Sequence, residues 1–208
     1  MQQPISQGTD STQPGVSLST IRGTAISSGL GGLLLVAYAI VMALKPRGCI
    51  AEECVGRTYR ETGPDGGILV LGAIGLIIAA TVGLFAIHRF EGRGSKVVRI
   101  AALVAASSLL VGVGLSGSAM WWLAFILLLL SFLAFAVTGA GLIRSRVLPA
   151  WSGAMLLVTS LLLFGMNDQN EAVLLVIPFG VAWMVLGGLL WAAASSPTKG
   201  WHSRVLHA

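Results

Sequence analysis

The chain has 208 residues, of which 55% are hydrophobic and only 10% are charged, and its formal net charge is +5. Because a soluble domain carries about 25% charged residues, this composition excludes a soluble domain, a disordered chain, a coiled coil and a nucleic-acid-binding domain. Together with a mean hydropathy of +0.87, it is typical of an integral membrane protein.

Five stretches of the chain lack Asp, Glu, Lys, Arg and His, and they set the number of predicted membrane spans. They are residues 23–44, 66–87, 100–143, 147–167 and 172–198. A membrane-spanning helix needs about 20 apolar residues, so the third stretch holds two spans, divided at the small residues 114–118. Unbroken apolar runs lack the alternation of barrel strands and favour helices. The sequence therefore predicts an all-α integral membrane protein with six transmembrane helices, near 22–44, 67–88, 99–116, 119–143, 150–166 and 172–194.

Similar Gly-Leu pairs close the even-numbered spans, which suggests three helical hairpins with their tips on one side. Residues 1–20 are rich in Gln, Ser, Thr, Pro and Gly and are predicted to be a flexible cytoplasmic tail. Residues 21–195 form the predicted bundle, and residues 196–208 a second cytoplasmic tail. We expect the first helix to be retained, because it spans a full bilayer and follows a longer tail than a signal peptide has.

Basic residues divide unequally between the two sides of this bundle. Nine lie on the side of the termini: Arg22, Arg89, Arg93, Lys96, Arg99, Arg144, Arg146, Lys199 and Arg204. Four lie on the other side: Lys45, Arg47, Arg57 and Arg60. The positive-inside rule then predicts both termini inside the cell (cytoplasmic) membrane and the longest loop, residues 45–66, outside it. The excess of positive charge is attributed to topology, with some attraction for anionic lipids, rather than to nucleic acid.

The only two cysteines, Cys49 and Cys54, lie in the 45–66 loop. The oxidising environment outside the cytoplasm predicts a disulfide between them. A redox relay is the alternative, but it usually needs a second cysteine pair, and a metal site lacks nearby His ligands. The loop also carries mixed charges, which are either solvated or a docking surface for another protein.

No ionisable residue lies in the interior of a predicted span, which argues against a proton-coupled transporter, an ion pump and a voltage sensor. The Ser and Thr residues there are expected to bond to their own or neighbouring helices. The segment 114–117 resembles the G-x-S-G motif in which rhomboid proteases place their nucleophile. A His base would lie on the opposite side, so the motif is interpreted as a turn. The histidines, His88, His202 and His207, are expected to be solvated, and no metal or cofactor site is predicted.

Small residues indicate how the spans pack. Ser28 with Gly32, and Gly112 with Ser116, are small-xxx-small pairs that permit close helix approach, within one bundle or with a second subunit. Pro178 is expected to kink the sixth span. Tryptophans near predicted span ends fit the membrane interface, whereas Trp183 is deeper and is expected to pack between helices.

The layout resembles that of small six-span membrane proteins of bacteria and archaea. The absence of a catalytic constellation favours a non-enzymatic accessory or structural subunit that packs against another membrane protein or itself in the lipid bilayer. The alternative is a carrier or binder of a neutral or lipid-like molecule, with a cavity near Pro178. A lipid-modifying enzyme would need a polar cluster, and residues 167–171 are the only compact one, better explained as a hydrophilic turn.

Overall fold

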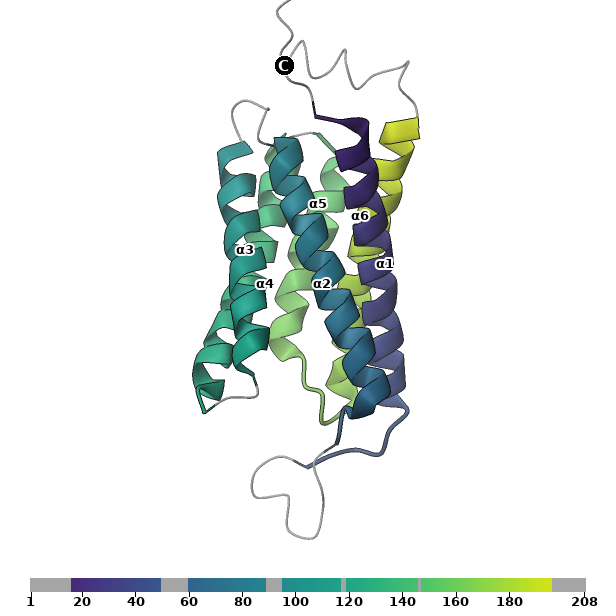
Figure 1. Ribbon diagram of the computed structural model, residues 1–208, viewed down its shortest axis with the longest axis vertical. Coiled ribbons are helices and arrows are strands. Elements are labelled where there is room, and N and C mark those ends of the chain that lie inside the picture. The colour runs from purple at the N-terminus through teal and green to yellow at the C-terminus, as the bar shows by residue number, and fades with distance from the viewer. Residues whose placement is uncertain (1–15, 50–59, 89–94, 117–118, 146, 196–208) are drawn as a thin grey trace, which may run out of the picture.

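The computed structural model describes residues 16–49, 60–88, 95–116, 119–145 and 147–195, and in this part of the chain every regular element is helical. Six α-helices run roughly parallel to one long axis (Figure 1). They are α1 (Leu18–Ala43), α2 (Gly63–His88), α3 (Ser95–Leu115), α4 (Trp121–Ser145), α5 (Ala150–Leu162) and α6 (Val176–Ser195). Two 3-10 helices, η2 (Leu163–Gly165) and η3 (Glu171–Leu175), lie between α5 and α6. The predicted all-helical architecture is confirmed for these residues.

Successive helices alternate in direction, and α6 closes the bundle against α1 (Figure 1). The most extensive contacts join α1 to α6 and to α2, and α3 to α4, whereas α5 packs on α4 more than on α6. The third predicted hairpin is therefore less tightly paired than the first two. We call the end where α1 begins and α6 ends the basic end, and the end where α1 ends and α2 begins the loop end.

Local signals fix where the helices begin. Ser17 caps α1, its hydroxyl accepting a hydrogen bond from the Thr20 N–H at 3.2 Å. The helix thus includes residues 18–20, which the sequence assigned to the flexible tail. Gly63, with a φ of +67°, precedes Pro64 and Asp65 in the first turn of α2. Proline suits a first turn because it has no N–H to leave unpaired, and a carboxylate favours the positive end of the helix dipole.

The sequence predicted that Pro178 would kink a long sixth helix, and the structure shows that this prediction is wrong. Pro178 lies in the first turn of α6, where backbone N–H groups have no partner within the helix, so the missing donor breaks no bond. The preceding residues form η3 instead of α-helix, and the Asn170 side chain caps η3 by accepting from the Ala172 N–H at 2.8 Å. The proline thus marks where 3-10 helix becomes α-helix.

Helix lengths separate α5 from the rest. Helices α1 to α4, and α6 together with η3, are each long and apolar enough to cross a membrane. Helix α5 has 13 residues and continues as the three-residue η2. At about 1.5 and 2.0 Å per residue, these two give roughly 26 Å, slightly less than the ~30 Å of hydrocarbon in a bilayer. The extended residue Met166 then leads to the turn at the loop end.

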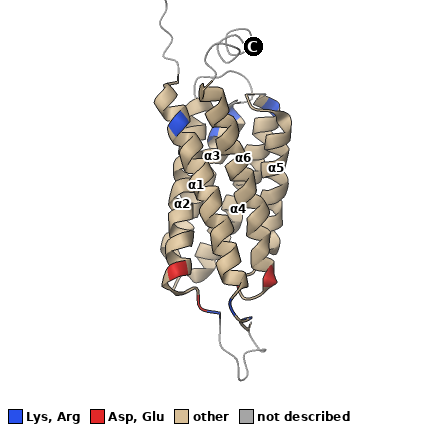
Figure 2. Cartoon of the chain, turned by 90° about the vertical axis from the view of Figure 1, so that its right-hand side faces the viewer, with Lys and Arg blue, Asp and Glu red and all other residues tan. Residues whose placement is uncertain are grey.

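Charge and aromatic side chains mark the two ends of the bundle. Among the described residues, the basic end carries only cations on α1, α3 and α4, and the acidic residues lie at the loop end (Figure 2). Trp121 and Trp122 begin α4 at the loop end, while Trp151 and Trp191 lie near the basic end, and all four are about half exposed or more. Trp183 is fully buried against Phe135 and Phe179, as the sequence predicted.

Candidate functional site

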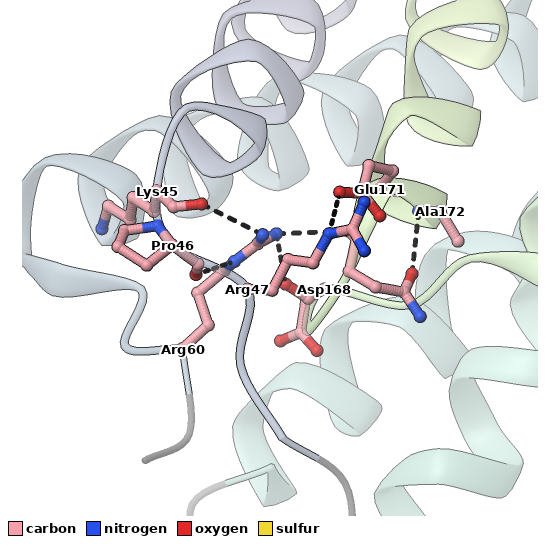
Figure 3. A network of polar contacts seen from close by, with 8 residues as sticks. Lys45, Pro46, Arg47, Arg60, Asp168, Glu171 and Ala172 are labelled. Atoms are coloured by element: carbon pink, nitrogen blue, oxygen red, sulfur yellow. Dashed lines mark hydrogen bonds and ion pairs between the residues drawn. The ribbon is translucent and has the colours of Figure 1, made fainter. Parts of the chain in front are cut away.

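A single arginine, Arg60, binds two other polar segments at the loop end, residues 45–46 and residues 168–170. Arg60 is only 7% exposed, and its guanidinium donates to four backbone carbonyls (Figure 3). Nε donates to Pro46 O at 2.9 Å and Nη2 to Lys45 O at 3.1 Å. Nη1 donates to Asp168 O at 3.1 Å and Asn170 O at 3.2 Å. One side chain thus ties the end of α1 to the turn between α5 and α6.

Gln169 strengthens the same junction. Its backbone oxygen accepts from the Gly48 N–H at 2.9 Å, and its side-chain oxygen accepts from the Arg60 N–H at 2.7 Å. A Cβ at Gly48 would lie 2.1 Å from that side-chain oxygen, so only glycine fits there. We call the seven residues that make these contacts the polar junction; they are Lys45, Pro46, Gly48, Arg60, Asp168, Gln169 and Asn170.

Two further contacts border the polar junction. Lys45 Nζ donates to Glu61 O at 2.9 Å and to Thr62 O, beside the start of α2. Arg47 and Glu171 form an ion pair with both side chains more than half exposed. An exposed pair is worth about 0–1 kcal/mol, so Arg60 and not this ion pair holds the segments together.

The polar junction has the chemistry of a structural clamp. Backbone carbonyls take up the Arg60 donors, so the guanidinium does not present them to a substrate. From the sequence, Arg60 is either a solvated loop charge or part of a docking surface, and its burial excludes the solvated interpretation. The 167–171 segment does form a turn, as predicted, but its backbone is bound by Arg60. Nothing in the local sequence indicates this, because the partners lie more than 100 residues apart.

The cysteine pair falls only partly within the described residues. Cys49 follows the polar junction and is 1% exposed. Cys54 lies outside the described residues, as does much of the predicted 45–66 loop. The Cys49–Cys54 disulfide therefore stays a prediction.

His88 is buried, contrary to the expectation that it would be solvated. It ends α2, its Nδ1 lies 2.9 Å from Leu84 O, and its Nε2 lies 3.5 Å from the Ser145 hydroxyl at the end of α4. The other two histidines lie outside the described residues. Within the described part of the chain, no group of three or more His, Cys, Asp or Glu side chains is placed to hold a metal ion.

Ser116 lies at the opposite end of the bundle from His88, since α3 separates them along its length. It is exposed, and its hydroxyl donates to Val113 O at 2.8 Å in its own helix. The 114–117 segment lies where α3 ends, as expected of a turn, although Gly117 is outside the described residues. The sequence paired Ser116 with Gly112 as packing residues. Because Ser116 is exposed at the end of α3, it does not share a helix contact with Gly112.

Most hydroxyls inside the bundle bond to their own helix, as the sequence predicted. Six of them donate to the carbonyl four residues earlier at 2.5–2.8 Å: Thr24, Thr81, Ser108, Thr138, Thr159 and Ser160. This geometry satisfies a hydroxyl in an apolar medium and leaves it little capacity for a ligand.

Of the two packing residues predicted in the first helix, Gly32 lies at the α1–α6 contact. A Cβ at Gly32 would lie 2.3 Å from Gly180 O, and Ser28 is fully buried. Gly112 packs α3 on α4, where its Cβ would lie 3.2 Å from Ala124 O. These glycines allow backbones to approach closely where lipid supplies no hydrophobic drive between helices.

Two other close approaches were not singled out from the sequence. A Cβ at Gly187 would lie 2.6 Å from Ala25 O. Between α4 and α5, a Cβ at Gly139 would lie 2.6 Å from Gly153 O, and a Cβ at Gly153 would lie 2.6 Å from Gly139 O. These positions contain glycine like many others in the chain, so composition alone could not distinguish them.

An open apolar groove of about 430 Å³ follows the outer surface of the α1–α6 contact. It is lined by small residues and by three larger apolar side chains that are each about half exposed: Ala25, Gly29, Gly187 and Gly188, and Ile26, Leu30 and Trp191. A Cβ at Gly29 or at Gly188 would meet no atom within 4 Å. Both glycines are therefore not required by packing within the bundle.

Comparison with models of protein families, with curated protein sequences and with solved structures finds no match to this chain.

Proposed function

We propose that the chain is a non-enzymatic polytopic membrane protein that works as an accessory or structural subunit. Its six helices cross the membrane, with the basic end in the cytoplasm and the loop end outside. The sequence assigns nine basic residues to the side of the termini and four to the other side, which supports this orientation, because cations are enriched on the cytoplasmic side of membrane proteins. The half-exposed tryptophans near both ends support it too, since such rings favour the two interfaces.

The orientation is tested with reporters fused at two points. Alkaline phosphatase, which folds only outside the cytoplasm, should be active when fused after Thr62 at the loop end. The same enzyme fused after Ala208 should be inactive, while a fluorescent protein that folds in the cytoplasm should fluoresce there. The reverse pattern at both points would contradict the orientation.

The groove on the α1–α6 surface is the observation that carries the subunit function. Its lining is wholly apolar, so its occupant is apolar as well. A Cβ at Gly29 or at Gly188 would meet no neighbouring atom, so internal packing does not require glycine at either position, yet glycine costs a helix about 1 kcal/mol relative to alanine. Exposed glycines beside larger apolar walls let a second backbone come close, as at small-residue helix interfaces. We assign the groove to one membrane-spanning helix of a second chain.

Leucine substitutions in the groove test this assignment. Gly188→Leu or Gly29→Leu should leave the bundle folded, because each new side chain starts in open space. Either should weaken association with the second chain by at least tenfold, which native mass spectrometry in mild detergent measures. Gly75→Leu is the matched control, since Gly75 is also open but lies on α2, away from the groove. Equal association of all three variants with the partner would refute the assignment.

One observation favours the alternative, a carrier of a neutral molecule. Ser28 Oγ on α1 and Trp183 Nε1 on α6 are buried and have no hydrogen-bond partner within the described residues. They lie on two helices in close contact, and a buried donor without an acceptor is costly, so a small molecule with a hydroxyl or carbonyl group would stabilise either position. A monomer that retains such a molecule in native mass spectrometry would support the carrier function instead.

A further inference from the structure

We propose that the basic end of α3 and α4 binds the headgroup of an anionic phospholipid, with Arg99 as its principal contact. The proposal rests on the proposed membrane insertion but not on association with a second chain. Four cations lie at this end among the described residues: Arg22, Lys96, Arg99 and Arg144. The described acidic residues all lie at the loop end (Figure 2), so none of them pairs with these four cations.

Arg99 differs from the other three in its burial. It lies about one turn inside α3 and is only partly exposed, and its Nε is buried with no hydrogen-bond partner in the described chain. A buried N–H of a charged group that lacks an acceptor is costly, so this site requires an anion or another acceptor. The planar guanidinium pairs well with a phosphate through two parallel hydrogen bonds.

The packing of α3 on α4 brings further positive charge to the same place. Val98 contacts Gly141, where a Cβ would lie 2.5 Å from Val98 Cγ2. Because the two helices are antiparallel, the chain beyond Gly141 leads Arg144 alongside the start of α3, which carries Lys96. Three cations thus lie at the adjacent ends of α3 and α4.

The neighbouring surface identifies a lipid and not a free anion. Ile100 and Leu103 follow Arg99 along α3 and are 64% and 46% exposed. A ligand that satisfies both features has an anionic head at Arg99 and apolar chains along these residues. Inorganic phosphate would satisfy only the first.

Lipid titration of the purified full chain tests the proposal. Phosphatidylglycerol should bind and raise the thermal midpoint, whereas phosphatidylcholine with the same acyl chains and inorganic phosphate should not. Arg99→Gln should weaken phosphatidylglycerol binding by at least tenfold, and Arg99→Lys should restore part of it. The matched control is Arg22→Gln, an exposed cation at the same end, where loss of general surface attraction is limited to about fivefold.

Three results would contradict the proposed lipid site at Arg99. Equal binding of both lipids, binding of inorganic phosphate alone, or equal losses in the Arg99 and Arg22 variants would each overturn the site. If Arg99→Gln does not fold, the double variant Lys96→Gln with Arg144→Gln replaces it, with the same expected selectivity loss. An unchanged preference for phosphatidylglycerol in that variant would also overturn it.

Discussion

Replacing Arg60 with alanine should destabilise the protein by about 2–4 kcal/mol, because four backbone carbonyls lose a charged donor at once. The junction lies at the end of the bundle, where water reaches some of these carbonyls, and this limits the loss. Arg60→Lys should recover only part of the stability, since one ammonium cannot span carbonyls from two segments in the way that a planar guanidinium does. Unfolding by denaturant in detergent micelles measures both changes.

Arg47 provides the matched control for Arg60. It is an arginine in the same loop, but it is exposed and bonded to a single carboxylate, so Arg47→Ala should cost less than about 1 kcal/mol. Hydrogen exchange should locate the damage: in Arg60→Ala, protection should fall at residues 45–48 and 166–171 and persist in the middle of α4. Equal stabilities of the two alanine variants would show that the polar junction is not what holds this end together.

Gly187→Ala should destabilise the bundle by about 1–3 kcal/mol or more, although alanine is the better helix former. Its Cβ would lie 2.6 Å from Ala25 O and 2.7 Å from Gly29 N. Both are backbone atoms of α1, so relief requires a shift of the whole helix and not a side-chain rotation. The contact between α1 and α6 is among the most extensive in the bundle, which makes this shift costly.

Gly188, the next residue along α6, provides the control for Gly187→Ala. Gly188→Ala places its Cβ in open space, so the gain in helix propensity of about 1 kcal/mol should leave stability unchanged or higher. Unfolding of both variants as monomers, in the same detergent, separates internal packing from association through the groove. A Gly187 variant as stable as the Gly188 variant would contradict the close approach of α1 and α6.

Much of the fold follows from the distribution of charge along the sequence. Residues 23–44 and 66–87 coincide closely with α1 and α2, and the division of the 100–143 stretch at 114–118 matches the end of α3 and the start of α4. These features follow from the cost of charge in a helix long enough to span hydrocarbon. The back-bonded hydroxyls follow from local chemistry, since the acceptor lies one turn away on the same helix.

The features that escaped prediction depend on contacts between distant segments. Arg60 resembles any loop arginine until the fold brings the carbonyls of residues 168 and 170 to it. His88 was expected to be solvated because it ends a helix, yet the end of α4 covers it. A kink was expected at Pro178 because proline lacks a backbone N–H and the sixth span was predicted to begin at residue 172, but composition does not distinguish 3-10 from α-helix at residues 172–175.

Native mass spectrometry of the wild-type protein, released gently from its own membrane, tests the subunit proposal most directly. We expect a defined complex that contains a second membrane-spanning chain, either another protein or a second copy. Gly188→Leu should dissociate this complex, because the leucine fills the groove between α1 and α6. A monomer that carries one stoichiometric small molecule, unaffected by Gly188→Leu, would contradict the account and identify the molecule to be tested as cargo.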